Sequence, residues 1–409
     1  MDAFSSGTLP HPFFAYTAEV LSWRLGSPEA GPLPVPVGAA QTELRAGRIL
    51  RAATRHTQVV LLGLGSGDLA AALAAHLPAA TSLTVVSLHP EAAQGLVSAG
   101  RLSWLAPAGR CQLLADSSPQ AACHLLLAAG FSPDSALTTV NPEPAGPLET
   151  RGLAQLRRLL TASRLVPPLP QPSLRPEMPT LALLARPEEP RLDAFFRAAR
   201  GLAGQAVIVW DAAVVPEAAT SAALLGMPVT HLARPLDNDF AAQRNALLAA
   251  CPPGWVLTLD PDERPGPGFG ASAARIMATP GLGGAYFPRL TLYPDPGRAK
   301  VGHGLWPDWQ LRLFRRDPAS GPRYVRPLHE RLEGVSGHTV LALDAPILHH
   351  NRLVADSAAV TGKLAAFSRL PGATAHRLNA DYPSLPLDFL TALSPSDGPG
   401  RLFVLPWSA

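Results

Sequence analysis

The feature of this sequence that most restricts its fold is a series of short apolar runs without the polar alternation of a half-exposed strand. Residues 59–63 and 83–88 are such runs in the first half, and residues 180–185 and 255–259 repeat the pattern in the second. A strand that is apolar on both sides is buried on both sides, as in a parallel sheet between layers of helices. Helix-like sequence separates the runs. This order predicts α/β architecture with two Rossmann-like domains, the first a doubly wound parallel sheet.

A proline-rich stretch marks the expected boundary between the two domains. Residues 166–179 cannot sustain a helix or a central strand, because proline lacks the backbone N–H that both need. The chain of 409 residues is long enough for two domains of ordinary size. We expect a Rossmann-like accessory domain over residues 1–165, a linker over 166–179, a second α/β domain over 180–355 and a helical or irregular extension over 356–409.

Composition argues against several classes of protein. The net charge is +3, but no long run of basic residues occurs, so we expect no nucleic-acid partner. Cys111, Cys123 and Cys251 are too few and too irregular for a disulfide framework or a zinc site, which is typical of a reducing compartment. Residues 1–15 lack a signal-peptide pattern, and no uncharged apolar run reaches about 18 residues. We therefore expect a cytoplasmic protein without a transmembrane segment.

An acidic cluster directly after a predicted buried strand is the main chemical signal. Asp260, Pro261, Asp262 and Glu263 follow the strand at residues 255–259. Ligands of open α/β sheets bind at the carboxyl ends of strands. Two carboxylates there can hold a divalent cation, which would neutralise a diphosphate and stabilise it as a leaving group. The alternative is an Asp–Pro turn with a solvated acidic face.

Five blocks in the second half occur in a fixed order around this cluster. They are Asp-Phe-x-x-x-Arg-Asn at 239–245, Trp-x-Leu-x-Leu-Asp-x-Asp-Glu-Arg at 255–264, Gln-x-Arg-Leu-Phe-Arg at 310–315, His-Glu at 329–330 and His-x-Asn at 349–351, with Lys363 after them. In content and order these blocks resemble the family 2 glycosyltransferases, in particular the branch that includes lipopolysaccharide-core sugar transferases.

The resemblance implies a GT-A fold that uses a nucleoside-diphosphate sugar donor and inverts the anomeric carbon. The acceptor would be a hydroxyl of a cell-surface glycan or protein. Glu330 is the candidate general base, and Asp262 the second catalytic candidate. The resemblance also implies a divalent metal, Mn²⁺ or Mg²⁺, held by Asp260, Asp262 and a histidine, either His349 or His329. The implied donor-binding residues are Asp211, Arg244, Asn245, Asp260 and Arg312.

Three further observations leave alternatives open. We expect Arg312 and Arg315 on one strand face, where they could clamp phosphate, although a plain surface strand fits as well. Residues 185–189 lack the family's Lys-Asn-Glu turn, and residues 211–215 lack its second Asp. Since both segments build the nucleotide pocket, a degenerate, non-catalytic transferase that acts as a binding or scaffold module is an alternative.

A glycine turn stands at the end of the first predicted strand. Gly63, Gly65 and Gly67 would let a nucleotide or S-adenosylmethionine approach the backbone closely, and they resemble the glycine turn of class I methyltransferases. At the end of the second strand, however, His89 stands where a ribose-binding carboxylate is expected. A Rossmann-like accessory domain without catalysis is therefore favoured, and an S-adenosylmethionine-dependent methyltransferase is the alternative.

Overall fold

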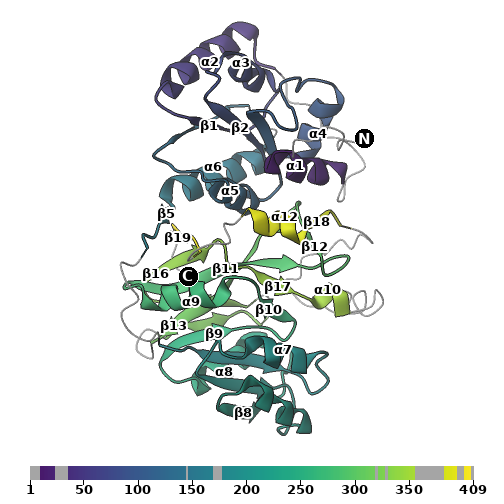
Figure 1. Cartoon of the computed structure of the whole chain (residues 1–409), viewed down its shortest axis with the longest axis vertical. Coiled ribbons are helices and arrows are strands. Elements are labelled where there is room, and N and C mark those ends of the chain that lie inside the picture. The colour runs from purple at the N-terminus through teal and green to yellow at the C-terminus, as the bar shows by residue number, and fades with distance from the viewer. Residues whose placement is uncertain are drawn as a thin grey trace. The chain divides into compact units, whose positions relative to one another are not determined.

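The computed structural model describes residues 10–23, 36–143, 146–168, 177–317, 321–327, 330–354, 382–393 and 400–406. The chain forms two compact units (Figure 1). The N-terminal unit contains residues 1–162, 297–307 and 361–393, and the C-terminal unit contains 163–296, 308–360 and 394–409. The boundaries expected from the sequence stay predictions. Lys363 and most of the expected linker and extension lie outside the described residues.

The N-terminal unit is built on a parallel sheet with the strand order β3-β2-β1-β4. All of its neighbouring strands pair in parallel, which confirms the parallel sheet expected from the apolar runs. The strands are β1 Gln58–Leu62, β2 Ser82–Ser87, β3 Cys111–Ala115 and β4 Ala136–Val140. The helices are α1 Pro12–Ser22, α2 Ala39–Ala53, α3 Asp68–His76, α4 Pro90–Ser98, α5 Pro119–Ala128 and α6 Pro147–Ala162.

Helix α1 has no counterpart among the predicted elements. It begins with Pro12, and the ring nitrogen Nδ1 of His11 accepts a hydrogen bond from Phe13 N at 3.1 Å. Phe13, Tyr16 and Val20 are buried on one face, at helical spacing. Aromatic and β-branched residues are only moderate helix formers. Tertiary packing, more than local preference, accounts for this helix.

Residues 297–307 lie in the sequence between two strands of the C-terminal unit but pack within the N-terminal unit. Trp306 is 2% exposed, and its ring lies 5.8 Å from that of Tyr16 and 4.8 Å from that of His124. The Tyr16 hydroxyl donates to the carboxylate of Asp116 and accepts from Gly302 N at 3.2 Å. Burial raises the pKa of Asp116 to about 6. The segment therefore supplies part of this unit's core.

The C-terminal unit is built on a large mixed sheet, with a main path β5-β19-β16-β11-β13-β9-β6-β7-β8. Strands β9, β6, β7 and β8 are parallel, and β13 pairs antiparallel with both β9 and β11. The strands of this sheet are β5 Arg164–Leu165, β6 Thr180–Ala185, β7 Gln205–Trp210, β8 Val229–Ala233, β9 Gly254–Thr258, β10 Glu263–Pro265, β11 Leu282–Thr291, β13 Asp308–Arg316, β16 His338–Ala342, β17 Ile347–His349 and β19 Leu402–Val404.

Shorter elements complete the two units. They are β12 Arg298–Lys300 with β18 Ser384–Pro386, β14 Arg323–Val325 with β15 Arg331–Glu333, α7 Leu192–Ala199, the 3₁₀ helix η1 Glu217–Leu225, α8 Phe240–Ala250, α9 Phe269–Ala278, α10 Asn351–Val354 and α12 Leu387–Ala392. No helix in the described ranges combines the length and the apolar character that spanning a bilayer demands.

Strand β6 shows why the apolar runs lack alternation. Leu181 and Leu183 pack in one hydrophobic cluster with Phe195, whereas Ala182, between them, packs in another with Leu247. Successive side chains of a strand point to opposite faces, so both faces of this strand are covered. The α/β class is confirmed: the structure has a parallel sheet and a large mixed sheet. The finer assignment of two Rossmann-like domains stays a prediction.

We expect Trp306→Ala to destabilise the N-terminal unit by about 3–5 kcal/mol, because the truncation leaves a cavity among buried rings. Urea unfolding followed by circular dichroism measures the loss. Leu305→Ala, at a half-buried neighbour, is the control and should cost much less. Equal losses in the two variants would show that the indole is not part of the core.

Candidate functional site

The acidic cluster lies in the turn between β9 and β10. Strand β10 pairs antiparallel with β17, and the register sets Glu263 opposite His349. As a result, His349 Nε2 lies 3.3 Å from Asp262 Oδ2. His349 is also oriented by Thr291, whose hydroxyl oxygen lies 3.1 Å from ring nitrogen Nδ1. The pairing of two short strands thus brings together residues that the sequence separates widely.

Asp260 lies between two buried arginines. Arg244, on α8, makes a 3.0 Å ion pair with Asp260 Oδ1, and Arg312, on β13, makes one of 2.6 Å with Oδ2. Arg244 Nε also donates to Glu330 Oε1 at 2.6 Å. Helix α8 is positioned by Asp239, whose carboxylate caps it by accepting from Ala242 N at 2.9 Å. One bonded chain therefore connects Asp260 to Glu330.

The charges of this network stabilise one another. Burial alone would raise the pKa of Asp260, but Arg312 and Arg244 hold that pKa well below its usual range. Burial would likewise lower the pKa of both arginines. The negative charge of Asp260 has the opposite effect, to which Glu330 adds at Arg244 and Glu263 adds at Arg312. Together these charges outweigh burial, so the pKa of each arginine is raised. Asp260, Arg244 and Arg312 are therefore all charged at neutral pH.

Glu263 holds the turn from inside the protein. Its side chain is 0% exposed, and Oε1 pairs with Arg289 at 3.0 Å and with Arg312 at 2.5 Å. Its other oxygen, Oε2, accepts from Asp260 N at 3.1 Å. Arg289 also pairs with Asp308. Sequence reasoning assigned no role to Glu263 or Arg289; an arginine inside the otherwise apolar stretch of β11 was the available signal.

Two predicted donor-binding residues already have partners within the chain. Asp211 follows β7, and its Oδ1 accepts from Leu236 N at 2.8 Å. The Asn245 side chain donates to Tyr324 O at 2.9 Å and accepts from Tyr324 N at 2.8 Å. Both polar atoms of Asn245 would have to leave Tyr324 to contact a donor. The donor roles of Asp211 and Asn245 stay predictions.

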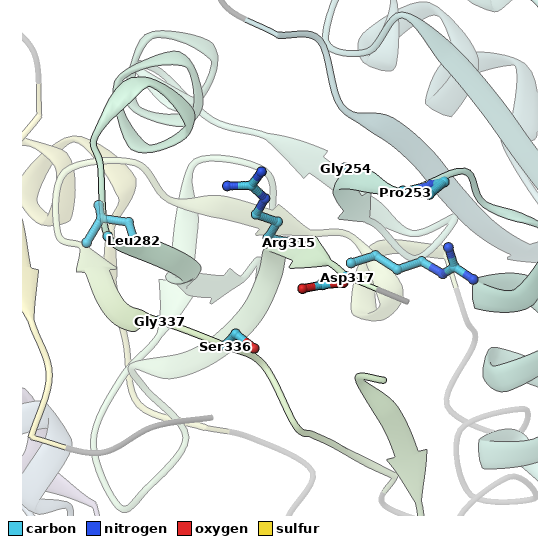
Figure 2. Close-up of a pocket in the computed structure, with 9 residues that line it drawn as sticks. Pro253, Gly254, Leu282, Arg315, Asp317, Ser336 and Gly337 are labelled. Carbon is cyan, nitrogen blue, oxygen red and sulfur yellow. The ribbon is translucent and has the colours of Figure 1, made fainter. Parts of the chain in front are cut away.

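The expectation that Arg312 and Arg315 lie together on one strand face, as a phosphate clamp, is wrong, because the two side chains have different surroundings. Arg312 is buried among the carboxylates, whereas Arg315 is exposed and lines a pocket of about 540 Å³ with Asp317 and Ser336 (Figure 2). That pocket is lined by Gly254, at the amino end of β9, so it is separate from the acidic cluster at the carboxyl end.

The side chains of the acidic cluster fit the coordination of a divalent cation only in part. No group of three His, Cys, Asp or Glu side chains within the described ranges is arranged to hold a metal ion. Asp262 and His349, however, lie 3.3 Å apart, close to the roughly 3 Å between adjacent ligands of an octahedral Mg²⁺ site. Both oxygens of Asp260 are engaged by arginines. His329 lies outside the described residues.

Comparison with known proteins adds little to this geometry. No family model matches the chain, and no curated protein matches it. Solved structures that match include S. aureus TarS, a glycosyltransferase, at 14% identity and a TM-score of 0.25. The match covers 33% of this chain and 28% of that one. A TM-score this low does not establish a shared fold.

We expect Glu263→Gln to lower the free energy of unfolding by about 3–5 kcal/mol, because two buried arginines lose a counter-charge. Urea titration at neutral pH measures this change. Glu333→Gln is the matched control, since Glu333 forms a 3.8 Å pair with Arg331 between exposed side chains; it should change stability by less than about 1 kcal/mol. A Glu263→Gln protein as stable as the parent would rule out a supporting role for this carboxylate.

Proposed function

We propose that the C-terminal unit is an inverting glycosyltransferase with a GT-A fold. It moves a sugar from a nucleoside-diphosphate sugar to an acceptor hydroxyl of a cell-surface glycan or protein, in the cytoplasm. One observation carries the proposal: each of the five sequence blocks contributes a side chain to a single cluster. These side chains are Arg244, Asp260 with Asp262, Arg312, Glu330 and His349, and each contacts another member of the set.

Asp262 and His349 are the proposed holders of Mn²⁺ or Mg²⁺. When bound, the ion supplies positive charge to the departing diphosphate. Asp260 has each of its oxygens bonded to an arginine and would add at most the remaining lone pair of one oxygen to these ligands. Its main role in this proposal is to hold Arg244 and Arg312 in place, so that positive charge is already oriented where negative charge develops on the leaving group.

Glu330 is the proposed general base. Arg244 fixes its Oε1, and Oε2 makes no hydrogen bond to any residue that the structure describes. Oε2 takes the proton of the acceptor hydroxyl as the hydroxyl oxygen bonds to the anomeric carbon. The bond from that carbon to the diphosphate breaks on the opposite side. The anomeric centre is inverted and the nucleoside diphosphate leaves.

The remaining predicted residues act around the donor. Asp211 stands at the carboxyl end of β7 and is half-buried, with Oδ1 held by Leu236 N. Its position suits a contact with the donor's base. Asn245 supports the pocket indirectly, by bonding the backbone of Tyr324, whose ring lies 5.5 Å from the Arg244 guanidinium.

We expect Asp262→Ala to abolish metal-dependent sugar transfer, with metal affinity reduced by about 10–100-fold or more. Transfer or hydrolysis of UDP- and GDP-sugars is measured with Mn²⁺ or Mg²⁺ and with chelator. Asp134→Ala removes an exposed aspartate from a loop of the other unit and should leave the rate unchanged. Full activity of Asp262→Ala in chelator would remove the metal from the proposal.

Glu330→Gln should reduce kcat by about 10²–10⁴-fold, because the amide cannot take the acceptor's proton. Since Gln retains an oxygen for Arg244, donor binding should stay nearly constant, so the loss should fall on kcat and not on KM for the donor. Calorimetry with UDP and GDP plus Mn²⁺ supplies the companion measurement. If the parent protein binds neither nucleotide, the degenerate scaffold is the better reading, as the missing second Asp after Asp211 would suggest.

A further inference from the structure

The glycine turn of the N-terminal unit has the build of an anion-binding site. Gly63, Gly65 and Gly67 follow β1 with φ values of +100°, +58° and +86°. The turn leads into α3, whose N-cap, Gly67, has no side chain to bond the first N–H groups of the helix. A strand–glycine turn–helix junction of this kind presents backbone N–H groups and the positive end of the helix dipole to an anion.

A carboxylate of the chain itself lies in this turn. Glu143, just after β4, has Oε2 placed 3.3 Å from Ser66 N and 3.0 Å from Ser66 Oγ, both of which donate to it. Arg45, on α2, pairs with Glu143 Oε1 at 3.3 Å, and the Glu143 side chain is only 6% exposed. The contacts are those that a bound phosphate would make: a backbone N–H, a hydroxyl and a guanidinium.

Side chains of the same unit also fill the space beside the central glycine, Gly65. A Cβ placed on Gly65 would lie 2.6 Å from Asn141 Nδ2, 2.8 Å from Glu143 Cβ and 3.0 Å from Glu143 Oε2. Position 65 therefore needs glycine because Asn141 and Glu143 approach it closely. An external ligand could make the same approach only where these side chains now lie.

The carboxyl end of β2 is likewise covered by a carboxylate of the chain. Glu149, on α6, has its Oε1 at 3.1 Å from Leu88 N and 3.5 Å from the Ser87 hydroxyl, both of which donate to it. Glu149 is 3% exposed. A carboxylate is therefore present where sequence reasoning found only His89, but it bonds the strand end itself. Glu143 and Glu149 thus cover both strand ends that a nucleotide would use in a sheet of this order.

We propose that the glycine turn is an anion site which the chain fills with the carboxylate of Glu143. A phosphate-bearing ligand binds there only when that carboxylate is removed or displaced. Ser66 and Arg45 are the groups that would hold the ligand. This proposal is independent of sugar transfer by the C-terminal unit, and it argues against the methyltransferase alternative for the N-terminal unit.

Calorimetry of the full chain with inorganic pyrophosphate tests the proposal. Divalent metal is left out, so that the C-terminal site does not contribute. Glu143→Ala should bind pyrophosphate at least about tenfold more tightly than the parent, since Ser66 N and Arg45 lose their internal acceptor, whereas the Ser66 hydroxyl still has Asp68 Oδ2 at 3.2 Å. Adding Arg45→Ala should cancel the gain. Glu91→Ala is the matched control, because it removes the same charge from the first turn of α4 in the same unit and should show no gain.

If Glu143→Ala does not fold, the pyrophosphate affinity of Glu143→Gln tests the proposal instead. Gln keeps the volume and an acceptor for Ser66 but gives up the charge that pairs with Arg45, so a smaller gain in pyrophosphate affinity is expected. The proposal is overturned by any of three results: tight pyrophosphate binding by the parent, an equal gain in Glu91→Ala, or no gain in folded Glu143 variants. Micromolar binding of S-adenosylmethionine by the parent would also overturn it.

Discussion

The C-terminal site depends on the placement of Asp260 between two buried guanidinium groups. Arg244 and Arg312 repel each other, and both lose hydration on burial; the carboxylate between them offsets both costs, together with Glu330 at Arg244 and Glu263 at Arg312. The pairing also fixes the backbone, because Glu263 binds Arg312 and the amide of Asp260 at once. The turn that carries Asp262 is thereby held by charge from a helix and a strand far apart in the sequence.

The two units use the carboxyl ends of their parallel strands in different ways. Ligands of open α/β sheets bind at such ends. In the C-terminal unit, arginines hold carboxylates there, and Asp262 and His349 lie beside them. In the N-terminal unit, Glu143 and Glu149 are instead bonded to backbone N–H groups that follow the strands. At this position in the sheet, carboxylates pair with arginines in one unit and bond the backbone in the other.

Local sequence predicted the strands well and the long-range contacts poorly. Strand β6 has the bounds of the apolar run at residues 180–185, and β1, β2 and β9 each begin one residue before their runs, because burial leaves a local pattern. The five sequence blocks identified residues of the cluster but did not predict which side chains they contact. Burial of Glu263 depends on arginines of other strands, and helix α1 depends on packing against residues nearly three hundred positions away, such as Gly302. Hydrophobic periodicity in the sequence does not predict such long-range contacts.

The path of residues 297–307 determines how the protein would respond to cleavage of its backbone. This segment is joined by peptide bonds to strands of the C-terminal unit on both sides, yet Trp306 is buried in the N-terminal unit. A protease that cleaves once between residues 166 and 179 would therefore not release two separate bodies. The pieces would remain associated as a complementing pair, with one fragment's tryptophan seated in the core of the other. On a sizing column the nicked protein would elute with the intact one, and only denaturant would reveal the break.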